Sequence, residues 1–127
     1  MRFSTYHYFF TATILEWKHQ LQSDKFKDII ISRLAFLAAE KRAIIYGFVV
    51  MSNPVHIIWQ VEDAYILSDV QHSFMNYTAQ MMLKELRNHH PEIMEGFRVD
   101  ASDRKHLIWE RNPLSVALWA KMFLNRN

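Results

Sequence analysis

Three polar side chains are of the types that metal-assisted chemistry uses. His56 stands inside the apolar run at residues 54–61, where β-branched and aromatic neighbours predict a strand. Tyr77 and Gln80 are one helical turn apart, so they share one face of the helix predicted there. An imidazole can ligate a metal, and a phenol can act as a covalent nucleophile. The pattern is compatible with a cluster of His56, Tyr77 and Gln80.

Each of these residues also has a purely structural interpretation. A histidine within a strand is often a hydrogen-bonded core or edge residue. A tyrosine on the apolar stripe of a helix is often a core residue whose hydroxyl is bonded. Pro54, two residues before His56 and therefore on the same strand face, has no side-chain donor for a metal. The residues alone leave the structural and the chemical interpretations open.

The elements that would position these residues follow from apolar spacing and turn residues. Strands are predicted at residues 6–15, 43–51, 54–61 and 106–109, with the second and third joined as a hairpin. Helices are predicted at residues 24–41, 68–88 and 114–123. This order predicts an α+β, ferredoxin-like split β-α-β-β-α-β fold, with an antiparallel sheet, helices packed on one face and a short C-terminal helix.

The predicted second helix, at residues 68–88, has recognisable start and end signals and an apolar stripe. Ser68 and Gln71 have the spacing of a capping box at its start, and His89-His90-Pro91 ends it. A polar loop follows at residues 92–105. The apolar stripe expected to face the sheet consists of Leu67, Val70, Phe74, Tyr77 and Met81.

Composition bounds the class of protein. The chain has 127 residues, of which 50% are hydrophobic, so we expect a single domain at residues 1–127. It has no cysteine, which excludes disulfides and cysteine-ligated zinc. Fifteen basic against thirteen acidic residues permit nucleic-acid binding without requiring it. Without a signal peptide or an apolar run of about 20 residues, we expect a cytoplasmic protein that makes no membrane contact.

Five stretches resemble, in the same order, those of a known family. They are Tyr-Phe-Phe-Thr-Ala-Thr at 8–13, Lys-Asp-Ile-Ile-Ile at 27–31, Ile-Tyr-Gly-Phe-Val-Val-Met-Ser-Asn at 45–53, Asn-Tyr-Thr-Ala-Gln at 76–80 and Trp-Glu-Arg-Asn-Pro-Leu-Ser at 109–115. Together they resemble the single-tyrosine HUH transposases, in particular the REP-associated tyrosine transposase group of bacteria. The resemblance covers most of the chain.

The resemblance implies a DNA transposase that cleaves and rejoins single-stranded DNA beside a hairpin. Tyr77 falls on the family's nucleophile, which forms a 5′-phosphotyrosine link. His56 falls on the second histidine of the His-hydrophobic-His motif, and Gln80 would be the polar ligand of a divalent metal, Mg²⁺ or Mn²⁺. The resemblance assigns no DNA-contacting residues. It implies a bacterial, cytoplasmic protein, and it allows either a monomer or a homodimer that shares active sites between chains.

The sequence departs from the family at two ligand positions. Pro54 stands where the first histidine of the motif belongs, and Met81 stands at the usual position of the third ligand. A thioether is a poor ligand for Mg²⁺ or Mn²⁺, which prefer oxygen. Relatives also often continue through another helix after the Trp109 stretch, so the chain is expected to be short at its C-terminus. We therefore predict weak or absent cleavage.

Three functions remain in competition on the sequence alone. The first is residual metal-dependent nicking and joining through Tyr77 and His56. The second is recognition of hairpin or single-stranded DNA without chemistry, in a decayed element or a copy retained for binding. The third is an unrelated ferredoxin-like domain that assembles through a sheet edge.

Overall fold

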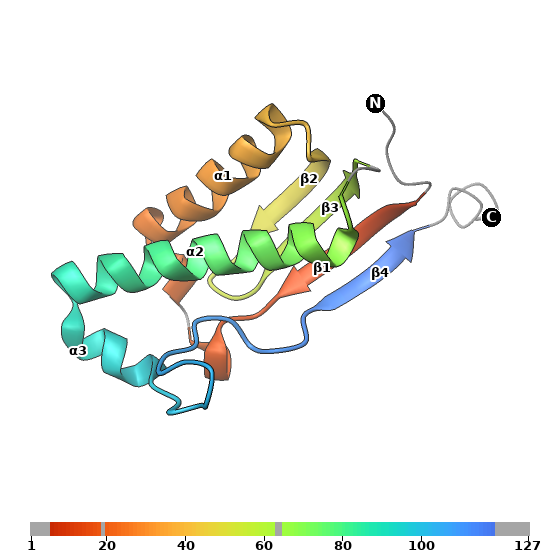
Figure 1. The fold of residues 1–127 in the computed structure, drawn as a ribbon. Coiled ribbons are helices and arrows are strands. Elements are labelled where there is room, and N and C mark those ends of the chain that lie inside the picture. Colours follow the sequence, from red (N-terminus) through yellow and green to blue (C-terminus); the bar gives the residue numbers. More distant parts are fainter. Residues whose placement is uncertain (1–5, 19, 63–64, 119–127) are drawn as a thin grey trace, which may run out of the picture.

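The computed structural model describes residues 6–18, 20–62 and 65–118. Its one sheet has the strand order β2-β3-β1-β4, and every neighbouring pair is antiparallel. Two long helices lie across one face of this sheet (Figure 1). The predicted α+β ferredoxin-like fold is confirmed. The elements are β1 (His7–Ala12), α1 (Asp24–Ala39), β2 (Ala43–Val50), β3 (Val55–Val61), α2 (Leu67–His89), α3 (Pro91–Met94) and β4 (Leu114–Leu118).

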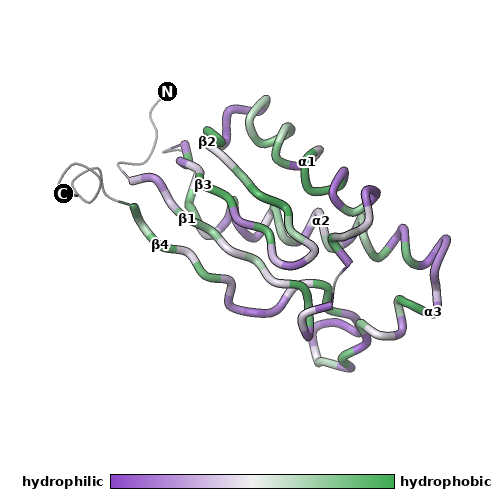
Figure 2. Tube along the Cα trace, turned by 180° about the vertical axis from the view of Figure 1, so that it is seen from behind, coloured by the Kyte–Doolittle hydropathy of each residue, from purple (hydrophilic) through white to green (hydrophobic). Residues whose placement is uncertain are grey.

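Strict alternation along β3 separates the two faces of the sheet. Val55, Ile57, Trp59 and Val61 are buried beneath the helices, whereas the residues between them are only partly buried. We call the other side of the sheet, which faces away from α1 and α2, the open face; Figure 2 is viewed from that side. None of the described helices is long and apolar enough to cross a membrane.

The core forms where aromatic rings of α2 meet those of the sheet. The fully buried ring of Phe74 makes edge contacts with Phe10 of β1 and Trp59 of β3, at centroid distances of 6.1 and 6.0 Å. Aromatic side chains bury more apolar surface than other side chains and so dominate the stability of a core. This contact fixes how α2 lies on the sheet.

The predicted stripe of α2 is wrong after Phe74. The buried face continues through Thr78 and Met82, whereas Tyr77 is 39% exposed and Met81 is only partly buried. On a helix, the residues three and four positions after Phe74, Tyr77 and Thr78, both lie beside it. Because Thr78 is polar, the sequence pattern placed Tyr77 on the buried face instead. The Thr78 hydroxyl is satisfied inside the core, because it donates to the carbonyl oxygen of Phe74 at 2.8 Å.

Helix starts also differ from the expected capping. The residue before α2 is Ile66, and no side-chain hydrogen bond caps the helix, so the predicted capping box of Ser68 and Gln71 is not formed. Ser23 precedes α1, and its side chain likewise makes no capping bond. The predicted polar loop at 92–105 includes all of α3 except its first residue, Pro91, and a turn of 3₁₀ helix, Glu95–Phe97.

The C-terminal part of the prediction is wrong. Residues 106–109 form no strand, and only isolated bridges join His106 to Arg98 and Trp109 to Ile14. The fourth strand is instead Leu114–Leu118, where a helix was expected; residues 119–123 of that expected helix lie outside the described residues. The edge of β1 that does not face β3 supplies backbone hydrogen-bond partners to residues 114–118. This pairing stabilises a strand there, although the local spacing of apolar residues favours a helix.

Adjacent methionines test the position of α2 on the sheet. Met82→Ala removes a fully buried side chain and should lower the free energy of unfolding by about 2–5 kcal/mol. Met81→Ala, the matched control, should cost roughly 1 kcal/mol or less, since Met81 lies outside the core. Urea denaturation followed by circular dichroism measures both. A larger loss for Met81→Ala would show that the register of α2 is wrong.

Candidate functional site

His56 lies on the open face, held by side chains of the neighbouring strand. Its Nδ1 is 2.8 Å from Oγ1 of Thr11 on β1, the residue paired with it across the ladder. Its ring stacks on Phe9, also of β1, with centroids 5.4 Å apart and planes 21° from parallel. The imidazole is therefore oriented by β1.

Tyr77 lies on the opposite side of the sheet, among the helices. Its ring packs against the guanidinium of Arg33 on α1, whose central carbon is 4.3 Å from the ring centroid. Arg33 also donates a hydrogen bond of 2.7 Å to Ser73 Oγ, one turn before Tyr77 on α2. Burial, and then repulsion from Arg42, lower the pKa of Arg33. Tyr77 is thus placed by a contact between α1 and α2.

The predicted cluster is not assembled within one chain. His56 and Tyr77 are separated by the sheet itself, since α2 packs on the face that carries Trp59 and His56 belongs to the other face. Gln80 is exposed on α2, beside a groove that does not include His56. The structure therefore keeps Tyr77 and Gln80 on one helix but brings neither of them to His56.

The turn before β3 serves a structural purpose. Asn53 accepts a hydrogen bond from the backbone N–H of Ile14 at 2.9 Å and donates one to the carbonyl oxygen of Lys18, also at 2.9 Å. These bonds tie the β2–β3 hairpin to the segment after β1. Pro54 follows directly and is partly buried. Pro54, which the resemblance places at the first histidine of the motif, thus lies in a well-anchored turn.

The residues around His56 do not fit the divalent metal that the resemblance implies. Mg²⁺ and Mn²⁺ prefer several oxygen ligands, above all carboxylates. In the described parts of the chain, no group of three or more histidine, cysteine, aspartate or glutamate side chains is arranged to hold a metal ion. Thr11, which contacts His56, offers only a hydroxyl. Within one chain, the described residues around His56 therefore supply too few ligands for Mg²⁺ or Mn²⁺.

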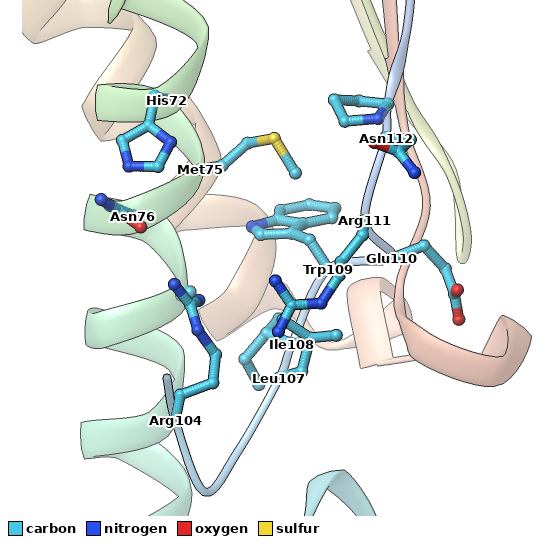
Figure 3. Close-up of a pocket in the computed structure, with 12 residues that line it drawn as sticks. His72, Met75, Asn76, Arg104, Leu107, Ile108, Trp109, Glu110, Arg111 and Asn112 are labelled. Atoms are coloured by element: carbon cyan, nitrogen blue, oxygen red, sulfur yellow. The ribbon is translucent and has the colours of Figure 1, made fainter. Parts of the chain in front are cut away.

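A second polar site lies between α2 and residues 103–113, and we call it the α2 groove; Figure 3 shows the residues that line one of its two cavities. It consists of two adjoining cavities of about 270 and 440 Å³. Both cavities are lined by Asn76 and Ala79 of α2 and by Arg104 and Ile108 of the opposite segment. Other residues that line one of the two cavities include His72, Gln80, Asp103, Lys105, His106, Trp109, Arg111 and Asn112.

The α2 groove was not found from the sequence. The available signal was the run Arg104-Lys105-His106, followed by Arg111, in a segment without helical or strand periodicity. Its walls come together only because the core fixes that segment against α2. The indole N–H of Trp109 donates to Thr78 Oγ1 at 3.0 Å, and this bond joins the two sides of the groove.

An acidic side chain organises the arginines of the α2 groove. The Asp103 carboxylate accepts hydrogen bonds of 2.9 and 3.4 Å from Arg111, and Arg104 Nε lies 3.4 Å from it. The hydrogen bond from Arg111 is the main cause that holds the pKa of Asp103 below its usual 3.8. Since the folded pKa is depressed, the pairing is fully present above pH 3.8 and is lost as the pH falls through the folded value.

Titration of Asp103 tests this pairing. Carboxyl ¹³C NMR should give a midpoint below 3.8 in the wild-type protein, and Arg111→Gln should raise that midpoint toward 3.8 because the charged donor is lost. Arg87→Gln, on the exposed side of α2, is the matched control and should leave it unchanged. An equal midpoint in the wild type and in Arg111→Gln would contradict the contact.

The chain is similar in structure to known proteins, but the sequence comparisons found no match. No protein-family model matches the chain, and no curated protein sequence matches it. A solved REP-associated tyrosine transposase bound to a REP hairpin has a TM-score of 0.64 and 14% sequence identity; the match covers 98% of this chain and 63% of that one. The chain thus spans less than two thirds of that transposase.

A second solved structure, described as a candidate transposase from Deinococcus radiodurans, has a TM-score of 0.63 at 14% identity. The match covers 93% of this chain and 82% of that one. At these identities the likeness concerns the fold. The chain therefore has the fold of these two transposases.

Proposed function

We propose that this protein binds hairpin or single-stranded DNA and that a single chain does not cleave it. The observation that supports binding is the fold, which is that of a transposase solved on a DNA hairpin. The observation that argues against cleavage is the sheet that separates His56 from Tyr77.

Strand cleavage by a tyrosine makes a strict geometric demand. The phenol oxygen must come within about 3–3.5 Å of a phosphorus atom whose oxygens are polarised at the same time. In one chain, a phosphate beside Tyr77 is on the far side of the sheet from His56. Pro54 offers no ligand, and His56 is engaged with Thr11. A single chain thus lacks the combination that the reaction needs.

Binding without chemistry makes a weaker demand on the positions of side chains. A single strand is held by cationic side chains along its phosphates and by side chains that contact its bases. The chain has a net charge of +2, with 15 lysine and arginine residues. Such binding should weaken steeply with salt, with a slope of about −0.7 for each phosphate that a single strand contacts.

A second candidate function is metal-dependent cleavage shared between two chains. Tyr77 is 39% exposed, and His56 lies on the opposite surface, so the two can meet only when one chain faces another. In that arrangement, Tyr77 would be the nucleophile of one chain, and His56 and Gln80 would be the side chains available to Mg²⁺ or Mn²⁺. The exposure of Tyr77 is the observation that favours this candidate.

A labelled hairpin with a single-stranded flank distinguishes the two candidates. Fluorescence anisotropy should show binding that survives a chelator and the Tyr77→Phe substitution, because neither metal nor hydroxyl takes part. Denaturing electrophoresis with Mn²⁺ should show no covalent adduct at any protein concentration. An adduct that needs Mn²⁺ and disappears in Tyr77→Phe would establish the shared-site enzyme instead.

A further inference from the structure

We propose that the α2 groove holds an unpaired nucleotide of the bound DNA, with its phosphate at Arg104 and Arg111 and its base against α2. This inference rests on the proposed function and assigns it a site. Neither His56 nor Tyr77 lines this groove. Its size, its charge, its amide side chains and its fixed walls support the assignment.

The dimensions of the groove suit a nucleotide. Its cavities of about 270 and 440 Å³ adjoin at Asn76 and Arg104, and pockets for small ligands typically measure about 300–1,000 Å³. Ile108 and Trp109 supply apolar surface, against which the face of a base can pack. A base-paired duplex is far too wide to enter a cavity of this size. The occupant is therefore a flipped or single-stranded nucleotide.

The charge of the groove suits a phosphate. Arg104, Lys105 and Arg111 line it together with two imidazoles. Figure 3 shows the guanidinium groups of Arg104 and Arg111 between α2 and the opposite segment. Guanidinium groups bind phosphate through paired hydrogen bonds. Glu110 is directed elsewhere, since its Oε1 accepts a 2.8 Å hydrogen bond from the backbone of Glu16.

Asp103 positions the two arginines before DNA arrives. It contacts both, so their side chains lose less freedom on binding than free side chains would. It also competes with the phosphate for the same donors and adds a negative charge to the site. Because of this competition and this negative charge, removal of the Asp103 carboxylate should strengthen DNA binding. Removal of either arginine should weaken DNA binding. These opposite signs separate the site from a merely structural ion pair.

Amide side chains on α2 are placed to contact the base. Asn76 and Gln80 are four residues apart and line the same groove. Within the part of the chain that the structure describes, neither side chain has a hydrogen-bond partner, and both are exposed. Amides donate and accept together, and a paired amide contact favours adenine. They can therefore distinguish bases, whereas arginines that bind the phosphate carry no base information.

The walls of the groove are already fixed in the unbound protein. The 3.0 Å bond between Trp109 and Thr78 is buried, and Trp109 itself is 3% exposed. On the other side, α2 is held by the ring contacts of Phe74. A preformed cavity costs little ordering free energy when a ligand binds. The groove is thus a rigid element on which a site can be built.

The test compares groove variants with a matched surface variant by fluorescence anisotropy at low salt. The probe is a fluorescein-labelled DNA hairpin with an adenine or thymine flank. Arg104→Gln and Arg111→Gln should each raise Kd about ten-fold and reduce the salt slope by about 0.7. Asp103→Asn should lower Kd. Arg87→Gln, exposed on α2 and outside the groove, should change Kd by less than about two-fold.

Two further measurements localise the base. Asn76→Ala and Gln80→Ala should reduce the preference between adenine and thymine flanks and leave the salt slope unchanged. A blunt hairpin without a flank should compete poorly with the probe. Thermal unfolding of each variant should match the wild type, since all six altered side chains are at the surface.

The outcomes separate this inference from the proposed function. If the wild type binds and the groove variants behave like Arg87→Gln, the α2 groove is not the site and the proposed function stands. If the blunt hairpin competes as well as the probe, the groove does not hold an unpaired nucleotide. If the wild type fails to bind at low salt, both proposals are overturned.

Discussion

The packing of α2 on the sheet is the contact on which the other features depend. Phe74 is fully buried between Phe10 and Trp59, and one turn later the Thr78 hydroxyl accepts the indole N–H of Trp109. The first contact sets the rotation of α2 about its axis, and the second sets the position of residues 103–113 against it. Loss of the Phe74 ring would create a large cavity, which costs about 3–5 kcal/mol in proteins generally.

This rotation determines which side chains can act together. With Phe74, Thr78 and Met82 turned inward, Tyr77 faces Arg33 of α1, and Asn76 and Gln80 face the α2 groove. Strand alternation independently sends His56 to the other face of the sheet. A polar tyrosine and a polar histidine thus share a domain without sharing a site, and the groove lined by arginines becomes the better candidate for holding DNA.

Sequence patterns predicted the parts of the fold that depend on local rules. Alternation around His56 identified β3 and its faces, and the hairpin before it was confirmed. The position of Tyr77 was missed because a buried threonine breaks an apolar stripe. Leu114–Leu118 was missed because its pairing with β1 is tertiary. The α2 groove could not be predicted, because its two walls are 20 or more residues apart and meet only through the core.

Crosslinking of bound DNA shows whether the unpaired flank lies in the α2 groove. A photoreactive base placed in the unpaired flank, followed by mass spectrometry of the crosslinked peptides, identifies the contacting segment. If the flank lies in the α2 groove, the crosslinks should fall in residues 72–83 of α2 and in residues 103–113. Crosslinks concentrated in β1 and β3 around Thr11 and His56 would contradict it, and would place the DNA on the open face of the sheet.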